Sequence, residues 1–305
     1  MYVYNNSNKL SIFIFFTNNY MIIYYMTIYF GAHIGVSKSL LNDVKHLKES
    51  GGNLLQIMLT VQGYKLIDED KESILLKLKE YVDKNNMKIV IHSSYTHNLA
   101  REWDNHSWWI KAMELEIKYA HMLGAIGLVV HFGKSLDIPI SQAYNNMYTS
   151  IIHLHNITKE YQSVKILLET STGQGSEMCY KLEDLAHFYR KFSGNNNSEI
   201  KNRVKLCIDT CHIFAAGYNV ITPDDIKRYL EEFDELIGIK YVQLIHLNDS
   251  KAGLGEKLDR HENIGKGKIG YGGLKYIFDY FTKLDIPIIL ETPGCNYAKE
   301  IKLLK

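Results

Sequence analysis

The segment VKLCIDT, residues 204 to 210, is a short apolar run that ends in an acidic residue. Continuous apolar strands that alternate with helices are typical of a parallel sheet covered on both faces. Longer stretches with helical periodicity lie between such runs, among them SLLNDVKHLKE, SILLKLKEYVDK, WWIKAMELEIKYAHML and LKYIFDYFTKL. Seven more strand candidates are TIYFGAH (27–33), NLLQIML (53–59), KIVIHSS (88–94), GLVVHFG (127–133), VKILLET (164–170), YVQLIHL (241–247) and PIILETP (287–293). Eight units of this kind predict a single-domain α/β fold, the (β/α)8 TIM barrel.

The expected barrel covers residues 27–305, because no Pro/Gly-rich linker divides this part of the chain. The polar tract SGNNNSEIKN, residues 193 to 202, predicts a loop inside one unit. Residues 1–26 predict a poorly ordered N-terminal extension, with a translation start at Met21 or Met26 as the alternative. A membrane anchor is the weaker interpretation, because Asn18 and Asn19 interrupt the apolar stretch 11–30.

Polar residues occupy equivalent positions at the ends of the apolar runs. In six of the eight runs a potential metal ligand directly follows the apolar core: His92, His131, Glu169, Asp209, His246 and Glu291. A barrel of this kind places its active site at the C-terminal ends of its strands, so these side chains would surround one opening. All six belong to residue types that bind zinc or manganese. Burying so many ionisable groups without a cation would be unfavourable, which predicts a multinuclear metal centre.

Three further candidates lie outside the strands. His212 follows Asp209 by three residues, so one helical turn would place both on the same face. Asp259 and His261 are two residues apart and would share one side of an extended loop.

Four cysteines lack the spacing of a disulfide scaffold and predict reduced thiols in a reducing compartment, the cytoplasm or nucleus, or a virion if the source is viral. Cys207 and Cys211 are interpreted as packing residues rather than ligands.

The overall charge excludes a global positive field that would attract nucleic acid, because 35 Lys and Arg residues face 34 Asp and Glu residues. The segment HLNDSKAGLGEKLDRHENIGKGKIG (246–270) is a local exception. Among its glycines it carries Lys251, Lys257, Arg260, Lys266 and Lys268. Flexible backbone N–H groups with nearby cations can bind phosphates. Grouped metal ions suit phosphodiester chemistry, and this loop would then bind phosphate. From composition alone, a mobile solvated surface loop is an equal alternative.

Four segments resemble those of the endonuclease IV family, the zinc-dependent apurinic/apyrimidinic (AP) endonucleases: LETSTGQGSEM, CIDTCHIFAAGYN, HLNDSKAGLGEKLDRHENIGKGKIG and LETPG. The resemblance runs from about Gly31 to the C-terminus. It implies a TIM barrel with three Zn²⁺ per chain, acting as a monomer on duplex DNA with abasic sites, without stable membrane association. The implied reaction is hydrolysis 5′ to the abasic site in base-excision repair, leaving a 3′-hydroxyl and a 5′-deoxyribose phosphate.

By the family pattern, one zinc would be held by His92, His131 and Glu169, the second by Glu169 as a bridge with Asp209, His246 and Glu291, and the third by His212, Asp259 and His261. Glu169 and Glu291 would be catalytic, with Glu291 accepting a proton. Tyr95, Lys251, Arg260, Lys266 and Lys268 would contact DNA. Relatives carry an Asn-Pro-Arg type of loop after the second strand, but this chain has LTVQGYK (59–65), where Gln62 or Tyr64 would replace the usual wedge.

Two other functions are compatible with parts of this pattern. A metal-dependent sugar isomerase or epimerase would use a similar barrel, but it would need neither the Asp259–His261 pair nor the Lys-rich loop. A catalytically silent DNA-lesion binder would not need the full ligand set. Metal analysis and an abasic-site nicking assay would distinguish the three.

Overall fold

The computed structural model describes residues 12–17, 20–25, 27–59, 69–294 and 296–305 of the protein. Eight parallel strands close into a barrel in the order β12, β3, β4, β5, β6, β7, β8, β9. The strands are β3 (Phe30–His33), β4 (Leu54–Met58), β5 (Lys88–His92), β6 (Gly127–His131), β7 (Lys165–Glu169), β8 (Val204–Asp209), β9 (Val242–His246) and β12 (Ile288–Leu290). All eight predicted strands are present, and the TIM-barrel prediction is confirmed.

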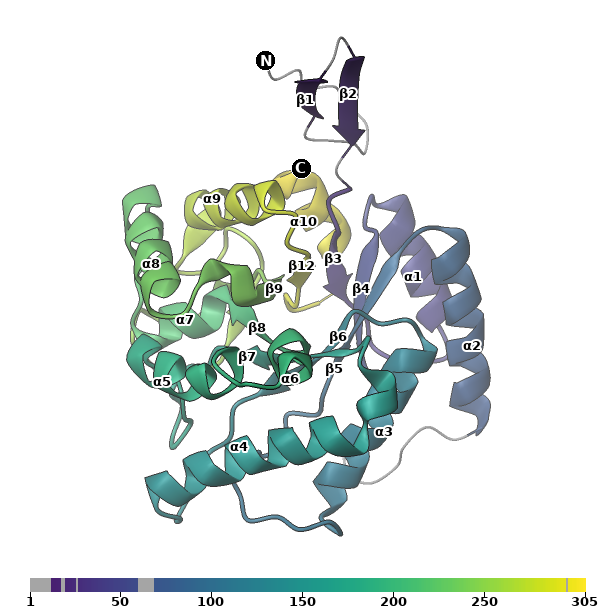
Figure 1. Cartoon of the computed structure of the whole chain (residues 1–305). Helices are drawn as coiled ribbons and strands as arrows, with labels where there is room; N and C mark the ends of the chain where they lie inside the picture. The colour runs from purple at the N-terminus through teal and green to yellow at the C-terminus, as the bar shows by residue number, and fades with distance from the viewer. Residues whose placement is uncertain (1–11, 18–19, 26, 60–68, 295) are drawn as a thin grey trace.

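Helices follow the strands along the chain and surround the barrel (Figure 1). They are α1 (Leu40–Glu49), α2 (Glu69–Lys84), α3 (Trp108–Met122), α4 (Ile140–Ile157), α5 (Leu182–Ser193), α6 (Ser198–Arg203), α7 (Thr210–Ala216), α8 (Pro223–Leu236), α9 (Gly270–Lys283) and α10 (Tyr297–Leu304), with short 3-10 turns at η1 (Lys159–Tyr161) and η2 (Ile239–Tyr241). None of the described helices combines the length and apolarity that crossing a bilayer requires.

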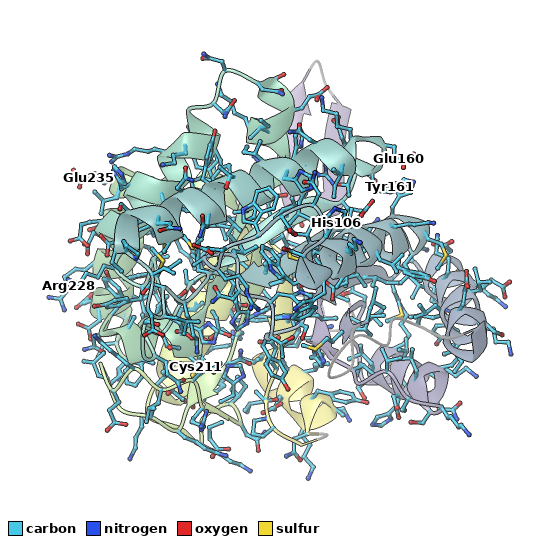
Figure 2. The ribbon with its side chains drawn as sticks, turned by 90° about the horizontal axis from the view of Figure 1, so that it is seen from below. His106, Glu160, Tyr161, Cys211, Arg228 and Glu235 are labelled. Carbon is cyan, nitrogen blue, oxygen red and sulfur yellow. The ribbon has the colours of Figure 1, made fainter. Side chains whose placement is uncertain are left out.

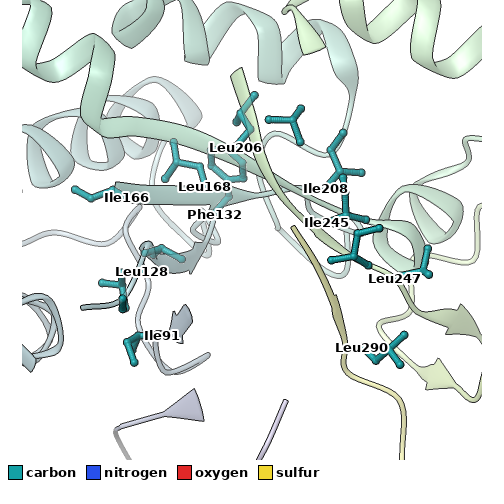
Figure 3. Packing of buried hydrophobic residues seen from close by; sticks show 14 of the residues in the cluster. Ile91, Leu128, Phe132, Ile166, Leu168, Leu206, Ile208, Ile245, Leu247 and Leu290 are labelled. Atoms are coloured by element: carbon teal, nitrogen blue, oxygen red, sulfur yellow. The ribbon is translucent and has the colours of Figure 1, made fainter. Parts of the chain in front are cut away.

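Buried apolar side chains form two clusters, one outside and one inside the barrel wall. The outer cluster joins strands to helices, and Figure 3 shows part of it, with Leu128, Ile166 and Leu206 on successive strands. The inner cluster consists of Leu54, Val90, Val129, Leu167, Cys207, Leu244 and Ile289. Because side chains alternate along a strand, the residue two positions after each inner residue also points into the barrel.

Strands β3 and β4 approach each other closely at Gly31, which pairs with Leu54. A Cβ atom at residue 31 would lie 1.6 Å from the backbone oxygen of Leu54. A side chain there is incompatible with this strand pair, so glycine is required on steric grounds rather than for backbone freedom.

The tract 193–202 differs from the prediction of a loop. Helix α6 occupies its second half and begins at Ser198, because the Asn197 side chain accepts a hydrogen bond from the Glu199 N–H at 2.8 Å and caps the helix. The Asn-Ser-Glu sequence is itself an N-cap signal, and it was outweighed by the overall polarity of the tract.

Two antiparallel strands precede the barrel, β1 (Ile12–Thr17) and β2 (Tyr20–Tyr25), with Ile12 paired to Tyr25. They project from one end of the molecule in Figure 1. The described part of residues 1–26 thus contains a two-stranded antiparallel sheet, while the N-terminal extension and its separation from a domain at 27–305 stay predictions. Two shorter strands, β10 (Asp249–Ser250) and β11 (His261–Glu262), pair in the loop after β9.

Candidate metal centre

Polar side chains form one layer at the C-terminal end of the barrel. In six strands this layer lies two positions beyond an inner apolar residue, for example His92 after Val90 and Glu169 after Leu167. Alternation therefore places these side chains inside the barrel, facing one another. The six predicted strand-end candidates belong to this layer: His92, His131, Glu169, Asp209, His246 and Glu291.

The first group is centred on one oxygen of Glu169. Its Oε2 lies 3.3 Å from Nε2 of His92 and 3.0 Å from Nε2 of His131. Strand pairing explains this proximity, because β6 and β7 are neighbours and His131 is in register with Glu169. One ligand atom from each of the three residues lies within 4.8 Å of the others, which suits a single metal ion.

The second group is centred on Nδ1 of His246. This atom lies 2.7 Å from Oε1 of Glu169, 3.1 Å from Oε2 of Glu291 and 3.8 Å from Oδ2 of Asp209. Glu169 therefore offers one oxygen to each of the first two groups. The buried Asn248 amide joins the two other carboxylates, donating to Asp209 at 2.7 Å and to Glu291 at 3.3 Å.

The third group combines His212 from α7 with Asp259 and His261 from the loop after β9. Oδ1 of Asp259 lies 3.3 Å from Nε2 of His212 and 3.1 Å from Nε2 of His261. Asp209 caps α7 by accepting the His212 N–H at 3.0 Å, which brings the imidazole of His212 into the cluster. The structure thus places all nine predicted ligands in one cluster, and their binding of metal stays a prediction.

Four of the five imidazoles are oriented by a hydrogen bond on the nitrogen that faces away from the carboxylates. In three of them Nδ1 donates to a backbone oxygen: His92 to Ser93, His212 to Thr170, and His261 to Glu291. His246 instead donates from Nε2 to Oε1 of Gln56 at 2.8 Å. This arrangement is the usual one for metal-binding histidines, because it leaves a lone pair directed at the ion. The Nε2 atoms of His212 and His261 are buried and accept no hydrogen bond.

Neighbouring acidic and basic side chains in the cluster shift one another's pKa values. Burial would raise the pKa of the Glu169 carboxyl, but the His246 and His131 imidazoles hold that pKa well below its usual range. Burial lowers the pKa of His261, whereas Asp209 and Asp259 raise it to about 9 overall. The Glu169 carboxyl is therefore ionised at neutral pH, and buried negative charge at this position is suited to divalent cations. The donor set, with two buried imidazole nitrogens that form no hydrogen bond and face the Asp259 carboxylate, fits a bound metal.

Gln56 and His33 also belong to the polar layer, although they were not among the predicted residues. Gln56 donates to Oε1 of Glu291 at 2.6 Å and to Nδ1 of His33 at 3.2 Å. Loss of solvent lowers the pKa of His33 to about 4, so its ring is neutral at pH 7. The signal for Gln56 was its place as the single polar residue of the buried strand LLQIM (54–58), where a buried amide needs a hydrogen-bonding partner.

Cys207 and Cys211 lie close enough to the cluster to be geometric ligand candidates. Both are buried, and burial raises the pKa of each thiol to about 12, so neither is a thiolate at neutral pH. Cys207 belongs to the inner apolar cluster, and Cys211, labelled in Figure 2, is a buried residue of α7. These observations agree with their interpretation as packing residues.

A cavity of about 320 Å³ opens at this end of the barrel. Tyr95 lines it with 62% of its surface exposed, in the loop after β5. The other lining residues are His33, Met58, His92, His131, His212, Asp259, His261, Glu291 and Thr292. Six of the nine predicted ligands therefore line this cavity, with an aromatic side chain beside them, while Glu169, Asp209 and His246 are buried and do not line it.

The predicted cationic contacts lie in the loop between β9 and α9. Lys251 is 3.9 Å from a carboxylate oxygen of Glu262, and the Arg260 guanidinium donates to the backbone oxygen of Asp259 at 2.6 Å. Lys266 and Lys268 are exposed. The predicted wedge residues Gln62 and Tyr64 lie outside the described residues. DNA contact by any of these side chains stays a prediction.

The sequence of the chain is similar to those of known proteins. Residues 44–305 match the family model described as "Xylose isomerase-like TIM barrel". The putative endonuclease 4 of Acanthamoeba polyphaga mimivirus is 33% identical over 91% of this chain and 89% of its own length. The probable endonuclease 4 of Petrotoga mobilis is 34% identical over 90% of this chain and 96% of its own. The chain belongs to the endonuclease IV family.

Solved structures agree with membership of the endonuclease IV family. Endonuclease IV from Thermus thermophilus superposes with a TM-score of 0.73 at 25% identity, covering 90% of this chain and 97% of that one. A D-tagatose 3-epimerase-like protein gives a TM-score of 0.66 at 17% identity, covering 90% of this chain and 94% of that one, and shows the shared fold alone. The resemblance seen in the sequence is confirmed as family membership.

Proposed function

We propose that this protein is a zinc-dependent AP endonuclease that hydrolyses the phosphodiester bond 5′ to abasic sites in duplex DNA. The observation that carries the proposal is the arrangement of nine ligands in three groups joined by Glu169 and Asp209. Membership of the endonuclease IV family supports the nuclease class over the sugar isomerases that share the barrel.

The ligand groups suggest how three Zn²⁺ ions would be held. His92, His131 and Glu169 would bind the first, Glu169 with Asp209, His246 and Glu291 the second, and His212, Asp259 and His261 the third. Metal ions grouped in this way supply hydroxide at neutral pH and neutralise charge that develops at phosphorus. Proton transfer and substrate binding would be carried out by the protein's own side chains.

Glu291 is the proposed proton acceptor. Its carboxylate lines the cavity, and its orientation is fixed by hydrogen bonds from Gln56 and Asn248. The His246 imidazole outweighs burial and holds the pKa of Glu291 below its usual range, so the carboxyl is ionised at neutral pH. Glu169 holds two ligand groups at a fixed separation.

Substrate binding would use the rim of the cavity. An abasic nucleotide has no base to stack, so its extrusion from the duplex is easy compared with that of a normal nucleotide. Tyr95 would fill the gap in the duplex, and Lys251, Arg260, Lys266 and Lys268 would contact phosphates.

The test is incubation of purified protein with a duplex that carries one tetrahydrofuran abasic analogue. We expect one nick 5′ to the analogue with a 3′-hydroxyl end, loss of cleavage with chelator, and recovery with Zn²⁺. An identical duplex without the analogue is the control. Intact abasic duplex under all conditions, or equal cleavage with chelator, would contradict the proposal. Metal analysis should give about three zinc ions per chain.

A further inference from the structure

One buried carboxylate, that of Asp249, collects an unusual number of backbone hydrogen bonds. Asp249 lies at the start of β10 and is fully buried. No predicted ligand or catalytic role uses it. Its two oxygens accept bonds at 2.9 to 3.3 Å from the N–H groups of Ser250, Gly265, Gly267, Ile269 and Gly270. A carboxylate that accepts several N–H bonds fixes the backbone that donates them.

The donating segment is built around this carboxylate. Gly265 and Gly270 have φ angles of 77° and 81°, a region that favours glycine. A Cβ atom on Gly267 would lie 2.5 Å from Oδ1 of Asp249 and 2.4 Å from the Ser250 backbone oxygen. The sequence NIGKGKIG therefore alternates glycines that turn their N–H groups toward Asp249 with two lysines.

Those two lysines, Lys266 and Lys268, are exposed, and neither forms an ion pair within the part of the chain that the structure describes. Their backbones are nevertheless fixed, because Lys268 N–H donates to the Ser250 oxygen at 2.7 Å and Lys266 N–H to the Asn263 oxygen at 2.9 Å. Long exposed side chains on a hydrogen-bonded backbone can extend into solvent from a fixed position.

Asp249 also connects this loop to the ligand cluster. It pairs with Glu262 in the β10–β11 ladder, whose next pair joins Ser250 to His261. Strand β10 therefore contacts both sides: its Asp249 binds the 265–270 loop, and its Ser250 pairs with His261.

We infer that Asp249 is a positioning residue that holds the 265–270 loop in a preformed conformation, so that Lys266 and Lys268 meet DNA phosphates at a fixed distance from the metal ligands. This inference rests on the proposed function. A preformed loop improves binding because its ordering is complete before the substrate arrives. Loss of Asp249 should therefore weaken substrate binding more than it slows the chemical step.

The experiment compares Asp249→Asn with the double variant Lys266→Ala, Lys268→Ala, using zinc-loaded full-length protein. The asparagine amide presents one acceptor oxygen and turns an NH₂ group toward backbone donors. We expect amide hydrogen exchange in 265–270 to accelerate by about tenfold or more and KM for the abasic duplex to rise by about tenfold. We expect kcat to stay within about twofold and zinc content to be unchanged. The double lysine variant should raise KM without altering exchange.

The control is Asp224→Asn, an exposed carboxylate on α8 with 88% of its side chain accessible, which should change neither quantity. Unchanged exchange in Asp249→Asn, an unchanged KM, or a fall in kcat alone would overturn the inference. If that variant does not fold, Gly267→Ala disturbs the same contact from the other side and should give the same rise in KM. Wild-type protein that fails to nick abasic duplex contradicts the proposed function instead, while exchange still decides whether Asp249 orders the loop.

Discussion

Glu169 lies within 3.7 Å of imidazole nitrogens from four histidines: His92, His131, His212 and His246. It comes from β7, between the strands that carry His131 and Asp209. A carboxylate in this position can bridge two ions, because its oxygens face different groups of ligands. Its charge is also the closest counter-charge to His246 in the described structure, at 2.7 Å.

Replacing Glu169 by glutamine tests this role. Glu169→Gln keeps the shape of the side chain but removes the charge, so we expect cleavage to fall by at least about a thousandfold and zinc content to fall below wild type. Circular dichroism should show an intact barrel. Glu235→Gln is the matched control, because Glu235 is exposed on α8 and lies at the edge of the molecule in Figure 2. Wild-type activity in Glu169→Gln would exclude the bridge.

The same scale shows what the sequence could predict about the site. Residue type and position at the strand ends were sufficient to predict that His92, Glu169 and the other strand-end candidates lie together, because the C-terminal ends of barrel strands surround one opening. Asn248 and Gln56 were missed, because neutral amides carry no metal-ligand signal in sequence. Their role is visible only when the hydrogen bonds to Asp209, Glu291 and His246 are known.

At the scale of elements, the pairing of β3 with β4 depends on Gly31. Gly31→Ala would place a Cβ atom 1.6 Å from the Leu54 oxygen, so the two strands must separate. We expect the free energy of unfolding to fall by at least about 3 kcal/mol, or soluble expression to be lost. Gly35→Ala is the matched control, because nothing lies within 4 Å of its added Cβ. Urea unfolding of both variants measures the difference, and equal stability would contradict the close approach.

Strands were predicted better than the connections between them. Each strand is a short, mostly apolar and mostly buried run, a pattern that can be recognised from neighbouring residues in the sequence. Helix α6 was missed because its identity depends on one side-chain cap at Asn197 within a polar tract. The pairing of Asp249 with Glu262 likewise depends on residues that approach only after the barrel closes.

For the whole molecule, the two apolar clusters predict a fold that does not require bound metal. Seven inner residues and a large outer cluster are buried without contribution from the ligands. We therefore expect chelated protein to stay folded but to lose cleavage activity. Each zinc site at a thousandfold excess of free metal over Kd should raise Tm by roughly 5 °C. Differential scanning calorimetry with and without chelator measures this shift. Unfolding on chelation at 25 °C would contradict an independent core.

The closing strand of the barrel comes late in the chain. β12 fits between β9 and β3, and Glu291 follows it directly. During synthesis, every chain that has not yet passed residue 291 exposes the unpaired edges of β3 and β9 and lacks one carboxylate of the cluster. Nascent and prematurely terminated chains that end before residue 291 would therefore lack the complete ligand cluster and be prone to aggregation.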